Sequence, residues 1–276
     1  MKPRIILLTF GLVVAASIGL PSYAGDVKVA AKFDANRLRT GTFVYQNLMG
    51  EKDIGKSEIS IRKTLGASTL DFSNVVTGEF SQRWTAITKE NLQPTSAKLS
   101  SGHARSTPIF DLKYTSDRVT GFSVRKGSRR LVDDKIPLAV VDQRVDWAAV
   151  TASDLKPGRN FEFEVYDPNI GVSHVIVRVA TAASVKVPAG QFEVYPATYQ
   201  IGKRTGVEQY RVLVTIQKPR MLVREEFPDG TTTDLVSGPI NSVAFVAIKM
   251  GRTQNREGSR PRDPLFLRPT TDPIQR

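Results

Sequence analysis

Apolar and polar residues alternate with a period of two along most of the chain from residue 40 to residue 236. Residues 160–167 read Asn-Phe-Glu-Phe-Glu-Val-Tyr-Asp, which places apolar side chains on one face of a strand and glutamates on the other. The pattern predicts about ten to twelve strands in all. The other predicted strands are 43–45, 57–62, 69–76, 79–88, 109–115, 118–125, 172–187, 191–202, 207–217, 221–227 and 231–236.

Short turn sequences separate these segments, and Asp229-Gly230 is the strongest of them. Glycine accepts a positive φ without steric penalty, and Asp-Gly between two alternating segments is a typical hairpin signal. We therefore expect 221–227 and 231–236 to be antiparallel neighbours.

One segment departs from this rhythm. Within 137–151, apolar residues recur every three or four positions at Leu138, Val141, Val145 and Ala148, which predicts one amphipathic helix lying against the sheet. The predicted fold is mainly β: an antiparallel curved sheet, or an open or half barrel, with this single helix. A split into two domains near 133–153 is the alternative.

The first 24 residues have the features of a secretory signal peptide. Lys2 and Arg4 precede an apolar stretch at 5–20, and Ser22 and Ala24 provide the small residues that a signal peptidase reads. Sixteen helical residues span about 24 Å, whereas a hydrocarbon core is about 30 Å thick. We therefore expect cleavage before Gly25 and a periplasmic or secreted protein; an uncleaved anchor is the alternative.

The last 26 residues differ in composition from the rest. Residues 251–276 combine four prolines with six arginines and lack an apolar period, so we expect a basic tail without a fold of its own. The expected organisation is a signal peptide at 1–24, an antiparallel β domain at 25–250 and this tail at 251–276.

Composition excludes several kinds of chemistry. The 276 residues contain no cysteine, which removes disulfides, thiolate metal sites and cysteine nucleophiles. The two histidines, His103 and His174, leave little scope for a metal site or a triad, and no short catalytic signature occurs. Paired carboxylates occur at Asp133-Asp134, Glu162/Glu164 and Glu225-Glu226, and we interpret the second pair as a solvated sheet face. We expect no cofactor, no metal and no catalytic residue.

The net charge of +12 draws attention to one candidate binding site. Arg125, Lys126, Arg129 and Arg130 form a basic turn around Gly127-Ser128, which could contact phosphate or anionic lipid head groups. A solvated hairpin tip is the alternative interpretation. Nucleic acid is not an expected partner, because basic and aromatic residues do not interleave as they do in single-strand binding platforms.

Several motifs resemble one known family in both order and spacing. They are the segment 45–61 with Gly50 and Ile54-Gly55, Leu92-Gln93-Pro94, Val187-Pro188-Ala189-Gly190-Gln191-Phe192, and Lys218 to Arg224 followed by Asp229-Gly230 and Leu235. Together they resemble an uncharacterised envelope family, domain of unknown function 3108, over about 40–236. The resemblance implies an exported, mostly antiparallel β-protein, curved like the half-barrels that carry lipid-modified proteins between membranes. It implies no established activity and no catalytic residues.

We therefore expect a non-enzymatic exported protein that binds an amphiphilic envelope component, such as lipid or lipopolysaccharide, or an envelope protein. An envelope hydrolase acting on glycan or ester, or a structural adaptor on anionic surfaces, is the alternative. A cavity large enough for an acyl chain would favour the first interpretation.

Overall fold

The computed structural model describes residues 29–64, 66–79, 81–102, 107–203 and 206–239. The predicted signal peptide, His103 and the predicted tail at 251–276 lie outside the described residues. No helix in the described ranges is long and apolar enough to span a membrane.

A 17-stranded sheet accounts for most of the described chain. Successive strands pair antiparallel from β2 to β9 and from β13 to β17, β11 pairs antiparallel with β12, and β12 pairs antiparallel with β14. The first half of the sheet consists of β2 (Gly41–Met49), β3 (Lys52–Thr64), β4 (Thr69–Gly78), β5 (Gln82–Lys89), β6 (Pro94–Ser101), β7 (Thr107–Tyr114), β8 (Arg118–Arg125) and β9 (Ser128–Lys135). The second half consists of β10 (Val140–Asp142), β11 (Asn160–Asp167), β12 (Gly171–Val179), β13 (Ala183–Val187), β14 (Gly190–Lys203), β15 (Gly206–Thr215), β16 (Leu222–Glu226) and β17 (Thr231–Ser237). A two-residue strand, β1 (Val29–Ala30), pairs in parallel with β11.

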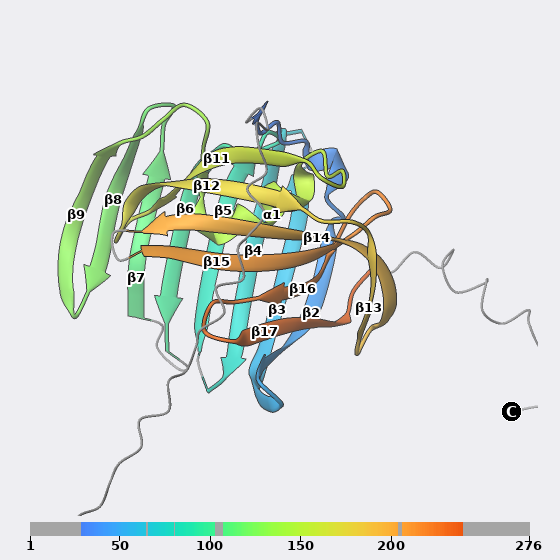
Figure 1. Cartoon of the computed structure of the whole chain (residues 1–276). Helices are drawn as coiled ribbons and strands as arrows, with labels where there is room; N and C mark the ends of the chain where they lie inside the picture. The colour runs from blue at the N-terminus through green and yellow to red at the C-terminus, as the bar shows by residue number, and fades with distance from the viewer. Residues whose placement is uncertain (1–28, 65, 80, 103–106, 204–205, 240–276) are drawn as a thin grey trace, which may run out of the picture. The chain divides into compact units, whose positions relative to one another are not determined.

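The two halves join where β17 pairs with β2, and the sheet then curls so that β11, β12, β14 and β15 cross in front of β3 to β7 (Figure 1). Alternation explains which face is buried: in β2 the side chains of Phe43, Tyr45 and Asn47 point inward, and the residues between them are more exposed. Both inner faces contribute to one apolar core. The predicted curved, open antiparallel sheet is therefore confirmed.

The sheet stays open along one seam. No backbone pairing within the described residues joins β9 at one end to β1, β10 or β11 at the other. Side chains bridge the seam instead: the Tyr166 hydroxyl donates a hydrogen bond of 2.7 Å to Asp134, and the Arg130 guanidinium donates to the Pro168 carbonyl. The fold is therefore an open barrel: side-chain hydrogen bonds, and no backbone pairing among the described residues, connect the two edges of the seam.

The expected helix is present but differs from the prediction in extent and setting. The segment 137–151 contains β10, a 3₁₀ turn η2 (Gln143–Val145) and then α1 (Asp146–Ala152). Val140 and Val141 pair in parallel with β11, and Leu138 is 71% exposed, so their apolar spacing does not reflect a helix face. All seven residues of α1 are buried, because the helix lies inside the curl against β10, β16 and the 3₁₀ turn η1 (Ala35–Arg37).

The Asp-Gly turn is confirmed as a hairpin. β16 and β17 pair antiparallel, Gly230 has φ of 83°, and Asp229 Oδ1 accepts a hydrogen bond of 2.9 Å from the Thr231 backbone N–H. The segment 172–187, predicted as one strand, forms two strands, β12 and β13. The sequence pattern did not indicate β6, β9 or β10. The segment 133–153 carries the chain between the two halves, which share one sheet.

Candidate ligand-binding pocket

A pocket of about 770 Å³ opens on the concave inner face of the sheet. Its volume lies within the usual range of small-molecule sites, roughly 300–1,000 Å³. The apolar lining comes from both halves of the sheet and from α1, and includes Ile59, Trp84, Phe110, Trp147, Tyr210 and Phe227. Its more exposed lining residues, such as Met49 and Ile170, lie at or beside hairpin turns. The pocket therefore combines an apolar interior with an entrance formed by hairpin ends.

A row of buried polar side chains crosses the pocket wall where the two halves of the sheet join. Glu225 of β16 is the register partner of Thr233 of β17, which in turn faces Asn47 of β2. The Thr233 hydroxyl donates to Asn47 Oδ1 at 2.9 Å, and Asn47 Nδ2 donates to the Ser57 hydroxyl at 3.0 Å. These four residues, all at most 8% exposed, form what we call the polar row.

Two carboxyl groups face the pocket without a cationic partner. Within the described part of the chain, neither Asp146 nor Glu225 forms an ion pair with Lys or Arg. The Trp147 backbone N–H donates to Asp146 Oδ1 at 2.6 Å, and the Tyr199 hydroxyl donates to Glu225 Oε1 at 3.1 Å. Each group thus has one hydrogen bond and retains further acceptor capacity.

Burial changes the acidity of both groups. Loss of hydration raises the pKa of Glu225 to about 7. Burial also raises the pKa of Asp146 well above its usual range, and the neighbouring charge of Glu225 raises it further. Burial therefore favours the protonated form of both carboxyl groups.

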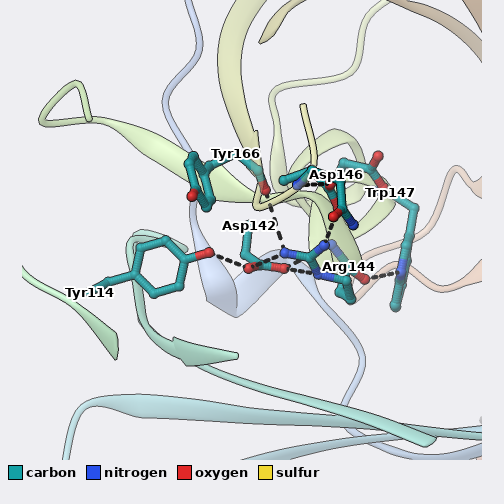
Figure 2. Close-up of polar contacts among 8 residues, drawn as sticks. Tyr114, Asp142, Arg144, Asp146, Trp147 and Tyr166 are labelled. Carbon is teal, nitrogen blue, oxygen red and sulfur yellow. Dashed lines mark hydrogen bonds and ion pairs between the residues drawn. The ribbon is translucent and has the colours of Figure 1, made fainter. Parts of the chain in front are cut away.

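Arg144 lies next to this pair, but its guanidinium is already engaged (Figure 2). It donates to both oxygens of Asp142 and, at 2.7 Å, to Asp167 Oδ2, while the Tyr114 hydroxyl donates to Asp142 from the other side. Burial alone would lower the pKa of Arg144, but the charge and hydrogen bonds of Asp142, together with Tyr114 and Asp167, raise it. Arg144 also stacks over Phe110, with 4.5 Å between Cζ and the ring centroid. Arg144, Asp142 and Asp167 thus form a buried ion-pair cluster. It supports the part of the pocket lined by Asn74, Asp146 and Glu225, which we call the pocket floor.

Asn74 adds an unpartnered group to the same wall. It lies on β4, is 8% exposed and lines the pocket, and its Oδ1 is buried without a hydrogen-bond partner in the described structure. Phe72, two residues earlier on the same face, contacts Trp147 edge-on with centroids 6.3 Å apart. Because unpaired buried polar atoms are rare, an unpaired acceptor in a cavity indicates a place where a ligand can donate.

The basic turn proposed from the sequence lies elsewhere. Arg125, Lys126, Arg129 and Arg130 are exposed at the β8–β9 turn, and none of them lines the pocket. The Arg129 guanidinium stacks on Phe122 at 4.0 Å, and Arg130 is bound at the seam. The turn itself holds Lys126 at φ 50° and Gly127 at φ 77°.

His174 and the paired glutamates come together on the opposite face of the sheet. His174 Nδ1 is 2.9 Å from Glu164 Oε1, and Nε2 is 3.1 Å from Glu162 Oε2. The His174 side chain is 43% exposed, as expected for a half-exposed sheet histidine. The sequence analysis treated these residues separately, whereas the register of β11 and β12 makes Glu164 and His174 direct partners. No group of three or more His, Asp or Glu residues in the described ranges is arranged to hold a metal ion.

Asp146, Arg144 and Asn74 were not predicted as site residues from the sequence, and Glu225 was considered only as one member of a carboxylate pair. A usable signal was present in the strands: Asn47 continues the inward series Phe43 and Tyr45, and Asn74 continues Leu70 and Phe72. A polar residue at a position that alternation assigns to the core indicates a polar site within that core.

The geometry defines an open antiparallel β-sheet protein with an apolar pocket that contains a few buried polar groups. The chain belongs to the family described as "Protein of unknown function (DUF3108)", which matches residues 44–236. The resemblance found in the sequence is thus confirmed.

Two solved structures share parts of the architecture. A β-barrel-like protein of domain of unknown function DUF1849 from Brucella abortus is 12% identical, with a TM-score of 0.48, covering 74% of this chain and 99% of the other. A protein with a YmcC-like fold from Bacteroides fragilis is 8% identical, with a TM-score of 0.31, covering 76% and 100%. No curated protein matches the chain.

Proposed function

We propose that this protein is exported and binds an amphiphilic component of the cell envelope in the pocket, without catalysing a reaction. The observation that carries the proposal is the cavity of about 770 Å³ on the concave face, lined by aromatic and aliphatic side chains from both halves of the sheet. Apolar walls with a few convergent polar groups are typical of small-molecule sites.

The export part of the proposal rests on the sequence of residues 1–24, with its basic start, apolar stretch and small residues before Gly25. N-terminal sequencing of protein recovered from the periplasm or medium checks it. We expect the mature chain to start at Gly25, and a membrane-bound chain starting at Met1 would contradict export.

The pocket is tested by filling it. Val76 lines the cavity, whereas Val75 is the adjacent residue on the opposite face of β4. We expect Val76→Trp to reduce binding of the fluorescent apolar probe N-phenyl-1-naphthylamine about tenfold or more, because a bulky side chain occupies the site. Val75→Trp is the matched control and should bind as wild type. Equal binding by both variants would contradict a ligand in this pocket.

A glycan hydrolase is the second candidate, because Asp146 and Glu225 are two carboxyl groups facing one cavity. Glycosidases need one protonated and one ionised carboxyl group at the reacting bond. Here burial raises the pKa of both groups, and the nearby charge of Arg144 offsets that rise only in part for Asp146. The arrangement therefore supports binding better than catalysis, and turnover of envelope glycans lost in Glu225→Gln would reverse that preference.

A further inference from the structure

Three strong hydrogen-bond donors that lie near Asp146 and Glu225 are already engaged. The Tyr199 hydroxyl donates to Glu225, the Trp147 indole N–H donates to the Arg144 carbonyl at 3.2 Å, and the Arg144 guanidinium is bound by Asp142 and Asp167. These three donors are therefore not available to bind a phosphate or carboxylate head group.

Three side chains of the pocket lining retain acceptor capacity. Asn74 Oδ1 is buried, has no partner in the described structure and belongs to a side chain that lines the cavity. Asp146 and Glu225 each accept one hydrogen bond and have no ion pair among the described residues. A ligand that satisfies all three must donate several hydrogen bonds, and a positive charge on it would compensate two carboxylates.

We propose that the pocket binds an amphiphile with a cationic amine head group, which Asp146, Glu225 and Asn74 recognise at the floor while its apolar chain lies against the aromatic walls. This inference rests on the proposed function and specifies the head group of its ligand. An ammonium group fits because it carries three donors and one positive charge. A hydroxyl head group would offer one donor and no charge.

The acidity of the carboxyl groups makes the inference sensitive to pH. The titratable and charged groups around the pair are Arg144 and Asp142 beside α1, Tyr45 on β2, Asp167 on β11, Tyr199 on β14 and Tyr210 on β15. An alkylammonium keeps its charge to about pH 10, whereas Glu225 ionises near its pKa of about 7. Bound cation would favour the ionised carboxylates, so binding near neutral pH should release protons.

The experiment compares ligands that share one chain and differ in the head group. Decylammonium, decanol and decyl sulfate, each below its critical micelle concentration, compete with N-phenyl-1-naphthylamine for the mature protein. We expect decylammonium to compete about tenfold more strongly than the other two, since hydrogen bonds to charged groups are the stronger ones. The net charge of the chain is +12, so non-specific attraction would favour the sulfate instead.

Variants assign the preference to the floor. We expect decylammonium to lose its advantage over decanol in competition with the probe in three variants, Asp146→Asn, Glu225→Gln and Asn74→Leu. Glu226→Gln alters the outward ion pair with Arg211 and should leave that advantage unchanged. Calorimetry in buffers of different ionisation enthalpy should show proton release with decylammonium and none with decanol.

The outcomes separate the inference from the proposed function. Equal competition by decylammonium and decanol, or stronger competition by decyl sulfate, would overturn the amine head group while leaving an apolar ligand in place. Butylammonium binding as tightly as decylammonium would overturn the amphiphile in favour of a small amine. If no ligand competes and Val76→Trp binds the probe as wild type does, the pocket function itself fails.

Discussion

Glu225 and Glu226 are neighbours in sequence, yet they lie in opposite environments. Glu226 points outward and forms an ion pair with Arg211, 3.3 Å between Nη1 and Oε2. Glu225 points into the pocket, 8% exposed, with a tyrosine hydroxyl as its hydrogen-bond partner. The same contrast holds more widely, since Lys52–Glu79, Lys63–Glu90 and Lys98–Asp111 are paired on exposed surface. Asp146 and Glu225 are thus left without an ion pair, among the described residues, in surroundings where charge is least stable, which is typical of functional sites.

The largest expected effect comes from breaking the buried ion pair that supports the floor. Arg144→Leu would leave Asp142, which is fully buried, and Asp167 without their cation. Removing one partner of a buried pair costs about 3–5 kcal/mol of unfolding free energy. Urea denaturation measures it, with Arg211→Leu as the exposed counterpart, which should change stability by about 1 kcal/mol or less. A similar loss in both variants would show that burial does not distinguish the two pairs.

The second prediction concerns a variant that increases the unfolding free energy. Burial raises the pKa of Glu225 to about 7, above its ordinary value of 4.5, so the folded state binds this proton more tightly than the unfolded chain does. Stability linked to Glu225 is therefore present at low pH and decreases as pH rises from about 4.5 to about 7. Glu225→Gln removes that decrease and should raise the unfolding free energy at about pH 8 by up to about 3 kcal/mol, with little change at about pH 4.

Glu226→Gln is the matched control for this second prediction and should lie within about 0.5 kcal/mol of wild type at both pH values. A Glu225→Gln variant that is less stable than wild type at the higher pH would show that the carboxylate is stabilised by its surroundings. Burial would then not destabilise the ionised form of Glu225 relative to that of Glu226.

The smallest effect concerns the outer surface. We propose that the basic turn formed by Arg125, Lys126, Arg129 and Arg130 contacts anionic head groups, with about 1 kcal/mol contributed by each residue near the surface. Neutralising Arg125 and Lys126 should weaken co-sedimentation with anionic liposomes at low salt, and about 0.15 M salt should screen most of the attraction. Arg125 and Lys126 are chosen because Arg130 also bridges the seam, so replacing Arg130 would change the fold as well as the charge. Wild-type protein that ignores anionic liposomes at low salt would contradict the proposal.

The sequence predicted most of the strands because alternation is a local property. The strand 160–167 and the Asp229-Gly230 hairpin coincide with β11 and with the β16–β17 turn. The helix was misplaced because α1 is buried on all sides, so it has no polar stripe, while the valines of β10 happened to extend its apolar spacing. Local pattern is a weak guide where tertiary burial overrides it.

The pocket was harder to predict, because it depends on contacts between distant segments. Asn74, Asp146 and Glu225 come from β4, α1 and β16, and only the curl of the sheet brings them to one cavity. Alternation could have identified Asn47 and Asn74 as polar residues at inward positions. It could not have distinguished Glu225 from Glu226, because the direction of a strand's faces depends on its neighbours.

The open seam leaves β9 as an edge strand, and this has a consequence for how copies of the protein meet. An unpaired edge offers backbone groups to any similar edge, which is a common route to aggregation. Five of the eight residues of β9 are charged: Arg129, Arg130, Asp133, Asp134 and Lys135. Charged side chains along an edge disfavour pairing with a second copy, because their hydration would be lost at the junction. The protein can thus keep its barrel open without exposing an edge that polymerises.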